Sequence, residues 1–425
     1  MMTPFRTFVI RSSCLFAIWC LVLGARSHAA DYPQFRGPNG DGNASARNLP
    51  STWNETTNVA WKTPIPGKGW SSPSLYRDRL YLTSGVPVDA SSEAGDLSLR
   101  ALCVDATSGK ILWDQEVFRQ AAATAPKIHN KNSHASPTPL VTSERIYVHF
   151  GHQGTACLNH AGQVLWKNNS HKYQPVHGNG GSPILVDGRL IFTCDGGSDP
   201  QVVALDAASG TEAWHFARPG DPPKKFSFCT PTAIQVSGKS QVICPGSGVI
   251  NALDPATGRE IWHVQHDGYS VIPKPLFGHG LVLLSTGYDA PTVLAIRPNG
   301  SGDVTDTHVA WSLNKGAPHT PSLLLVGDEL YMVSDRGVAT CVDARTGKEH
   351  WQERIGGNYS SSLVQADGKI YIQSEEGPAI VIRPGKKFDK LADAGFNEKT
   401  LASYAVGDSA LFIRTEKNLY RIQAK

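Results

Sequence analysis

The chain of 425 residues carries 40 Lys and Arg against 37 Asp and Glu, which gives a formal net charge of +3. Three of the basic residues, Arg6, Arg11 and Arg26, lie within residues 1–30, where no acidic residue occurs, so the remaining chain is formally neutral. A neutral chain lacks the basic patch that binding to nucleic acid or to an anionic membrane surface needs, so we expect neither partner.

Residues 1–30 predict a signal peptide for export. Arg6 and Arg11 precede an apolar run, CLFAIWCLVLGA (14–25), that is too short to cross a bilayer, and SHAA (27–30) supplies small residues for cleavage. Trp19 stands directly before Cys20, where a lipoprotein signal requires a small residue, and no later apolar run is long enough for a membrane span. We therefore expect a periplasmic or secreted protein without a lipid anchor.

An arm of residues 31–58 leads into a repetitive remainder of the chain. A single strand, NVAWKTPI (58–65), comes first, and eight segments of the form strand, short turn, strand follow it. Turn pairs such as DG, GD, GK and GH join the strands of these segments and indicate hairpins. The segments span residues 71–85, 135–151, 181–197, 229–246, 271–287, 319–337, 360–377 and 401–418.

A second pattern follows most of these hairpins. It holds an Asp, a Gly four residues later and a Trp eight residues after the Asp, as in LDPATGREIW (253–262). The Asp accepts hydrogen bonds from turn N–H groups, the Gly takes a positive φ, and the Trp ring packs between neighbouring sheets. The pattern or a looser copy of it ends at Trp113, Trp166, Trp214, Trp262, Trp311 and Trp351.

The two patterns together predict four antiparallel strands in each unit of roughly 40–50 residues, which is the size of a propeller blade. The last unit ends near Ile422 without a fourth strand, and the strand 58–65, which carries Trp61, supplies one. This pairing leaves no free sheet edge between the first and last units. The sequence thus predicts an all-β, eight-bladed β-propeller over residues 59–425, closed by an N-terminal strand, with Phe388 near the eighth Trp position.

Six cysteines follow the predicted signal peptide. Three stand two residues before the turn Asp or its equivalent, where other copies have Ala, and are interpreted as buried free thiols. These are Cys103, Cys157 and Cys341. The other three, Cys194, Cys229 and Cys244, lie at strand ends of the third and fourth units and allow one disulfide without a preferred pair.

The pattern A-x-D-x-x-T-G-x-x-x-W resembles the tryptophan-docking repeat of pyrroloquinoline-quinone (PQQ) propeller proteins. That family includes quinoprotein alcohol dehydrogenases and the outer-membrane assembly lipoprotein BamB. The segments DYPQFRGPNGDG (31–42), LPSTWN (49–54) and KNSHASPTP (131–139) look like those of exported PQQ-like propellers of the planctomycete type. The resemblance runs from about Asp31 to the C-terminus, and it leaves the activity open because propellers host many functions.

The sequence departs from the quinoprotein dehydrogenases in two ways. It contains no Cys-Cys dipeptide and no C-x-x-C-H haem motif. No catalytic residue or calcium ligand of that family maps onto a numbered position, so we name no catalytic and no metal-binding residue. The cofactor is therefore unknown, and PQQ with calcium is an expectation that no particular residue supports.

The mouth of the central channel is the place where side chains from all the blades converge. Polar residues surround the starts of the innermost strands, and their imidazole, amide and lysine groups suit an anionic or sugar-like ligand. The alternative is a channel lined by ordinary solvated side chains. The candidate ligand-binding residues are Asn132, His134, His177, Asn179, Tyr269, Lys274, His319 and Tyr359, with Lys131 and Asn358 beside them.

Three other motifs favour structure over metal binding. HFGH (149–152) brings two histidines together without a third ligand nearby in sequence. PNGDGN (38–43) departs from an EF-hand calcium loop at Ala44 and Pro50. Asp303 and Asp306 lie in an extended turn that suits a surface hairpin better than a cation site.

We interpret the chain as an exported, monomeric propeller that acts as a ligand-binding or protein-interaction scaffold and is not catalytic. Its protein or small-molecule ligand is expected at the central channel face. The alternative is a PQQ-dependent oxidoreductase that acts on alcohols or sugars at the channel mouth. A third hypothesis is recognition of a polysaccharide or a peptide by the loop face.

Overall fold

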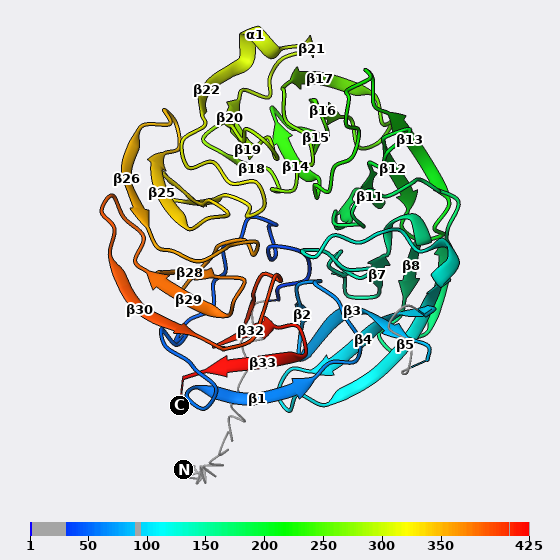
Figure 1. Cartoon of the computed structure of the whole chain (residues 1–425), viewed down its shortest axis with the longest axis vertical. Coiled ribbons are helices and arrows are strands. Elements are labelled where there is room, and N and C mark those ends of the chain that lie inside the picture. The colour runs from blue at the N-terminus through cyan, green and yellow to red at the C-terminus, as the bar shows by residue number, and fades with distance from the viewer. Residues whose placement is uncertain (2–30, 90–94, 408, 425) are drawn as a thin grey trace.

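The computed structural model describes residues 1, 31–89, 95–407 and 409–424. Its strands form eight sheets arranged around a central axis, seven of them with four strands and one with an added fifth strand (Figure 1). The predicted all-β, eight-bladed propeller with four-stranded antiparallel blades is therefore confirmed. The predicted signal peptide falls on residues 2–30 and lies outside the described residues.

Blades one to four follow one another in chain order, and each runs from an innermost to an outermost strand. Blade one contains β2 (Ser74–Tyr76), β3 (Arg79–Pro87), β4 (Leu97–Asp105) and β5 (Ile111–Gln120). Blade two contains β6 (Leu140–Val141), β7 (Ile146–His149), β8 (Thr155–Leu158) and β9 (Val164–Asn168). Blade three contains β10 (Ile184–Val186), β11 (Arg189–Cys194), β12 (Gln201–Asp206) and β13 (Glu212–Ala217). Blade four contains β14 (Thr232–Val236), β15 (Lys239–Pro245), β16 (Val249–Leu253) and β17 (Glu260–Gln265).

Blades five to eight continue the ring. Blade five contains β18 (Leu276–Gly278), β19 (Leu281–Ser285), β20 (Val293–Ile296) and β22 (Val309–Leu313). Blade six contains β23 (Leu324–Val326), β24 (Glu329–Val333), β25 (Val338–Asp343) and β26 (Glu349–Arg354). Blade seven contains β27 (Val364–Ala366), β28 (Lys369–Gln373), β29 (Pro378–Ile382) and β30 (Lys390–Gly395). Blade eight contains β31 (Ala405–Gly407), β32 (Ala410–Arg414), β33 (Asn418–Gln423) and β1 (Val59–Pro64).

The two ends of the chain close the ring in the last blade. Strand β1 pairs antiparallel with β33, from Val59 opposite Ile422 to Pro64 opposite Asn418 (Figure 1). The helical segments are short: η1 (Ala122–Thr124), η2 (Gly151–Gln153) and α1 (Thr305–His308). In the described part of the chain, no helix has the length and hydropathy needed to cross a membrane.

The closing Trp of one blade packs over the glycine turn of the next blade. Gly258 has a φ of +73°, and a Cβ at this position would lie 2.7 Å from the ring of Trp214. Most of the indole N–H groups donate to a backbone carbonyl in the next blade. The pairs are Trp61 to Ala106 (3.1 Å), Trp113 to His160 (3.1 Å), Trp166 to Ala207 (3.2 Å), Trp214 to Pro255 (2.9 Å), Trp311 to Ala344 (3.3 Å) and Trp351 to Gly385 (3.0 Å).

Trp262 differs from the other closing Trp residues because the loop of blade five is longer. Its indole N–H donates to Oε1 of Gln241 at 2.9 Å, and its ring is fully buried. The short strand β21 (Gly302–Asp303) of the long loop pairs in parallel with β17, with Gly302 beside Trp262. The blade-five loop therefore covers the outer edge of blade four.

The prediction for the eighth closing position is corrected by the structure. Ala392 of β30 pairs across the strands with Val381, as the Trp residues pair with small residues elsewhere. Phe388 lies before this strand and contacts the ring of Trp351, with centroids 5.2 Å apart. The spacing from the turn misplaced Phe388 because the blade-seven turn departs from the Asp-Gly pattern.

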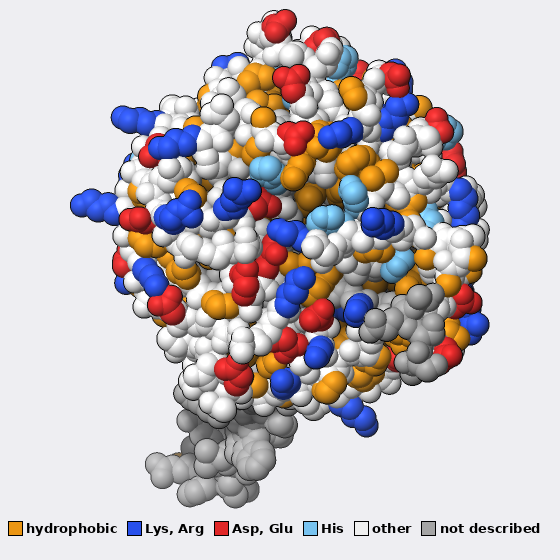
Figure 2. Space-filling view, in the orientation of Figure 1, with side chains coloured by type: hydrophobic (Ala, Val, Ile, Leu, Met, Phe, Trp, Pro, Cys, Tyr) orange, Lys and Arg blue, Asp and Glu red, His pale blue; other side chains and the backbone are white. Residues whose placement is uncertain are grey.

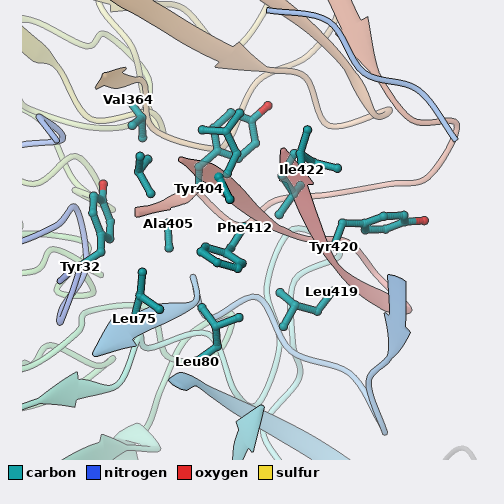
Figure 3. Close-up of a cluster of buried hydrophobic side chains, with 14 of the residues drawn as sticks. Tyr32, Leu75, Leu80, Val364, Tyr404, Ala405, Phe412, Leu419, Tyr420 and Ile422 are labelled. Carbon is teal, nitrogen blue, oxygen red and sulfur yellow. The ribbon is translucent and has the colours of Figure 1, made fainter. Parts of the chain in front are cut away.

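A large buried cluster lies where the ring closes, and it joins blades one, seven and eight to the N-terminal arm (Figure 3). Trp53 of the arm packs against Tyr371 of blade seven and Tyr404, which precedes blade eight, with ring centroids 6.1 and 6.2 Å apart. The arm thus supplies a large aromatic ring near the blade seam at which the closing strand has only Ala392.

The cysteines behave as packing residues. All six between residues 103 and 341 are buried and free, so the disulfide that the sequence left open does not form. Cys103, Cys157 and Cys341 each pair across the strands with the closing Trp of their own blade. A small side chain is needed there because the large indole occupies the neighbouring space.

Two glycine substitutions in blade four test the Trp contact. Gly238 and Gly258 both have positive φ, but a Cβ at Gly238 meets nothing within 4 Å. We expect Gly238→Ala to lower the free energy of unfolding by about 1–2 kcal/mol through backbone strain alone. Gly258→Ala should cost about 1–3 kcal/mol more, because it also displaces Trp214. Urea denaturation measures both values, and equal losses would contradict the role of the Trp–Gly contact.

Candidate ligand-binding cavity

A ring of hydrogen bonds surrounds the channel. At one equivalent position before seven of the eight innermost strands, the backbone N–H donates to the side-chain hydroxyl of the next blade. The seven bonds measure 2.9–3.1 Å. We call the accepting residues the hydroxyl belt: Ser72, Thr138, Ser182, Thr230, Ser322, Ser362 and Ser403.

Lys274 occupies the eighth belt position and interrupts the ring of hydroxyls. Its backbone N–H donates to Oγ of Ser322 at 2.9 Å, and its Nζ donates to the carbonyl of Gly40 in the arm at 3.0 Å. The side chain is 3% exposed. Burial, followed by repulsion from the Arg36 guanidinium, lowers the pKa of Lys274 to about 7.

The N-terminal arm crosses the channel beneath the belt. Tyr32 bridges to Leu75 in blade one, and the carbonyl of Pro33 accepts a hydrogen bond from Val141 in blade two. Nη2 of Arg36 donates to the carbonyl of Leu323, before blade six, at 2.5 Å. Figure 1 shows this first part of the chain passing through the centre of the ring. The arm therefore closes one end of the channel.

The other end of the channel opens into a cavity of about 1060 Å³. Phe35 of the arm and six of the belt residues line it, and loops from several blades form its walls. Figure 2 shows histidine and hydrophobic side chains gathered around the hollow at the centre of this face. Its volume is that of a site for a ligand of several rings.

Aromatic and histidine rings form one continuous wall of the cavity, which we call the aromatic arc. Neighbouring rings in the arc contact one another with centroids 5.1–5.8 Å apart and steeply tilted planes. In order around the mouth they are His129, His177, Phe226, Tyr269, Tyr288 and His319. Such a wall offers apolar ring faces and polar ring edges to a ligand.

Charged side chains at both ends of the aromatic arc are already bonded within the protein. Nζ of Lys131 lies 2.7 Å from Oε1 of Glu375, which also accepts a hydrogen bond from Ser360 at 2.6 Å. Oδ2 of Asp335 accepts the backbone N–H of His319 at 2.7 Å. The charged side chains of the lining are Lys131, Lys224, Arg336, Asp289 and Asp335. Acidic and basic groups are equal in number once Glu375, which pairs with Lys131 beside the cavity, is counted with them.

The structure brings some of the candidate ligand-binding residues together in this cavity. Asn132, His177, Tyr269 and His319 line it, as do Lys131 and Asn358. The sequence did not single out Trp70, Phe226, Tyr288 and Asp335, which also line it. Glu375, which pairs with the lining residue Lys131, occupies the same turn as Asp335 in the adjacent blade: SEEG (374–377) and SDRG (334–337). That likeness was the available signal.

The other four candidate residues were expected at the channel mouth, but they do not line the cavity. Asn179 is buried and accepts a hydrogen bond from the hydroxyl of Tyr173 at 2.8 Å. Tyr359 belongs to a hydrophobic core cluster, and Lys274 is buried against the arm. His134 is partly buried, and burial lowers its pKa. These polar groups point into the protein because inner-strand starts also contact neighbouring blades.

The donor groups in the described residues do not fit a calcium ion. No group of three or more His, Cys, Asp or Glu side chains in that part of the chain is placed to hold a metal. The cavity has two lining carboxylates: Asp335 already accepts the backbone N–H of His319, and Asp289 lies 4.0 Å from Lys224. Calcium takes six to eight oxygen ligands. His149 of HFGH bonds Thr155 at 2.8 Å, and burial lowers its pKa to about 3.

These features define a class: a closed eight-bladed propeller with a one-ended cavity on its axis. The chain belongs to the family described as "Outer membrane protein assembly factor BamB", which matches residues 44–172, 100–269 and 247–387. A protein of that name from Burkholderia pseudomallei (strain K96243) is 29% identical over 115 residues. That match covers 26% of this chain and 29% of the relative.

Solved structures share the fold at low sequence identity. Quinohemoprotein alcohol dehydrogenase from Comamonas testosteroni is 12% identical with a TM-score of 0.68, over 93% of this chain and 81% of that one. BamB from Moraxella catarrhalis is 13% identical with a TM-score of 0.57, over 85% of this chain and 99% of that one. Both an assembly factor and a dehydrogenase are therefore built on this fold, so the fold does not choose between them.

The pKa of Lys274 makes the stability of the protein depend on pH. Above pH 7 the folded chain releases this proton, whereas the unfolded chain keeps it until near the ordinary lysine pKa of 10.5. The free energy of unfolding should therefore rise with pH through this window. We expect the difference between wild type and Lys274→Met to change by up to about 1.4 kcal/mol per pH unit from pH 7 to 9.

Urea denaturation at pH 6–9 measures this difference. Lys315→Met is the control, because its ammonium is exposed and pairs only with Glu349 at the surface. Its pH profile should follow that of the wild type. Parallel profiles for Lys274→Met and wild type would contradict the assignment of the slope to Lys274.

Proposed function

We propose that this chain is an exported, monomeric and non-catalytic propeller that binds a ligand in its axial cavity. The observation that carries the proposal is the cavity itself, which the arm closes at one end and the aromatic arc walls on one side. A channel that only admitted water would not require six contacting rings from consecutive loops. The ligand is therefore expected to contain one or more rings that pack against this wall.

A redox function finds less support in the cavity. Of the two lining carboxylates that could hold calcium beside a quinone, Asp335 accepts the backbone N–H groups of His319 and Thr320, and Asp289 lies 4.0 Å from Lys224. The likeness to a quinohemoprotein alcohol dehydrogenase is one of fold. We therefore derive no redox step, and PQQ-dependent oxidation of alcohols or sugars is kept as an outcome of the test.

The membership of the BamB family supports a role in binding rather than in chemistry, because the matched family is described as an assembly factor. The partners of those relatives are not assigned to this chain. A protein segment that inserts an aromatic side chain into the cavity would use the same wall as a small ligand.

The site is tested with a panel of small molecules against the purified protein. The panel contains aromatic acids, neutral oligosaccharides of two to four units, and PQQ with and without calcium. At least one ring-containing compound should raise the Tm of the wild type. Tyr269→Ala, in the aromatic arc, should weaken its binding about tenfold or more by calorimetry.

Phe277→Ala is the matched control, because Phe277 is exposed on the innermost strand of blade five and does not line the cavity. Its affinity should equal that of the wild type. Equal affinity in Tyr269→Ala would overturn the site. Dye-linked oxidation of an alcohol or a sugar after addition of PQQ and calcium would overturn the non-catalytic assignment in favour of the oxidoreductase.

A further inference from the structure

The floor of the cavity is a ring of hydroxyl groups with unused donors. Six belt side chains line the cavity, and each is at least 94% buried. They are Ser72, Thr138, Ser182, Ser322, Ser362 and Ser403. Each oxygen accepts one backbone N–H from the neighbouring blade, and among the described residues none of the six donates its own hydrogen. A hydroxyl has one donor besides its acceptor sites, so six O–H donors remain.

Three buried basic side chains of the protein lie at or beside the belt. Arg36 donates to the carbonyls of Ser322 (3.4 Å) and Leu323 (2.5 Å), and Lys274 occupies the eighth belt position. Nη1 of Arg414 donates to Oγ of Ser71 at 2.5 Å, directly before the belt residue Ser72. All three side chains are at most 3% exposed.

These cations have few acidic partners. The hydrogen bonds of Arg36 and Lys274 go to backbone carbonyls, and those of Arg414 go to the carbonyls of Ser71 and Thr83 and to the Ser71 hydroxyl. Asp41 acts electrostatically on Arg36 and Lys274, whereas burial alone lowers the pKa of Arg414, to about 9. One carboxylate, that of Asp41, thus acts on two of the three basic side chains, and burial is the only influence on the pKa of the third.

The hydroxyl donors and the buried positive charge both favour an anionic ligand. Buried cations without anionic partners are costly, and an anion nearby offsets that cost. Hydroxyl donors bind an oxyanion through charge-assisted hydrogen bonds, which are stronger than neutral ones. The upper walls add no net charge when Glu375, the partner of Lys131, is counted with the charged side chains of the lining. The attraction for an anion therefore comes from the floor.

We propose that the cavity binds an acidic ring compound, with its oxyanion on the hydroxyl belt and its ring against the aromatic arc. The inference rests on the proposed function, since it names the ligand class of the same cavity. Carboxylate, phosphate and sulfate share the chemistry that the floor recognises, and the ring distinguishes the ligand from a free inorganic ion. A neutral sugar would use the aromatic arc but leave the floor cations uncompensated.

The belt contains a matched pair of residues for testing this assignment. Thr138 and Thr230 each accept one backbone N–H from a neighbouring blade, at 3.1 and 2.9 Å. Thr138 lines the cavity and Thr230 does not. Thr138→Val and Thr230→Val therefore remove the same inter-blade hydrogen bond, but only the first removes a donor from the floor.

The probes are 4-hydroxybenzoate and 4-hydroxybenzamide, which share a ring and differ in charge at pH 6, where Lys274 is protonated, and calorimetry measures both affinities. We expect wild type and Thr230→Val to bind the benzoate at least tenfold more tightly than the benzamide. Thr138→Val should lose about tenfold in benzoate affinity and little in benzamide affinity. Sodium sulfate and sodium phosphate, each against sodium chloride at equal ionic strength, should compete with the benzoate if the floor holds the oxyanion.

Each other result overturns the inference. Equal binding of the two probes, with both lost in Tyr269→Ala, refutes the anionic floor and leaves the aromatic cavity intact. Equal losses of benzoate affinity in Thr138→Val and Thr230→Val assign the effect to blade packing. Binding of sulfate or phosphate without the benzoate refutes the ring-bearing ligand. Binding of neither probe refutes the ligand class, while the wider compound panel still decides the proposed function.

Discussion

The backbone N–H at the start of each innermost strand faces the neighbouring blade, and its need for an acceptor organises the whole ring. A buried N–H without a partner costs free energy, so seven of the eight blades supply a hydroxyl at the same position for the blade before. Seven such bonds tie the blades together around the axis. Six of the seven hydroxyl groups line the cavity floor, so one set of contacts both holds the channel together and gives it its chemistry.

A second set of contacts joins the blades at their outer rim. The closing Trp reaches over a glycine turn, and its N–H finds a carbonyl in that turn, as Trp214 does at Pro255. Where a blade lacks the turn, a different segment takes over: the long loop of blade five covers Trp262, and Trp53 of the arm packs near the seam after Ala392. The ring tolerates these exceptions because burial of a large ring, rather than one particular bond, supplies most of the stabilisation.

The arm converts a channel into a cavity. Its contacts with Leu75, Leu323 and Lys274 hold it across one end of the axis. Arg36 of the arm adds a buried positive charge to those of Lys274, which precedes β18, and Arg414 of β32. The cost of those buried cations is the physical reason to look for an acidic ligand at this site.

The repeat made the fold predictable from the sequence, because a pattern that recurs in every unit reports a contact that every unit makes. The spacing of Asp, Gly and Trp predicted the closing turns, and the strand at 58–65 predicted the ring closure that β1 and β33 make. Phe388 was misplaced because blade seven lacks this pattern.

The candidate site was only half predictable. Polarity near the strand starts located Asn132, His177, Tyr269 and His319, which line the cavity. The same polarity also pointed to Asn179 and Lys274, which are buried in contacts with other segments. Sequence spacing tells which residues share a blade position, but it does not tell which way a side chain turns between two neighbouring blades.

By itself, the sequence determined the number of blades, their strand order and the place of the channel, because these follow from local turns and from repetition. Only the tertiary structure decided that the arm closes the channel, that Arg36, Lys274 and Arg414 each contact residues at or beside the belt, and that six rings join into one wall. Those features bring together residues that are far apart in the chain. Their meeting depends on the closure of the whole ring, which no local pattern encodes.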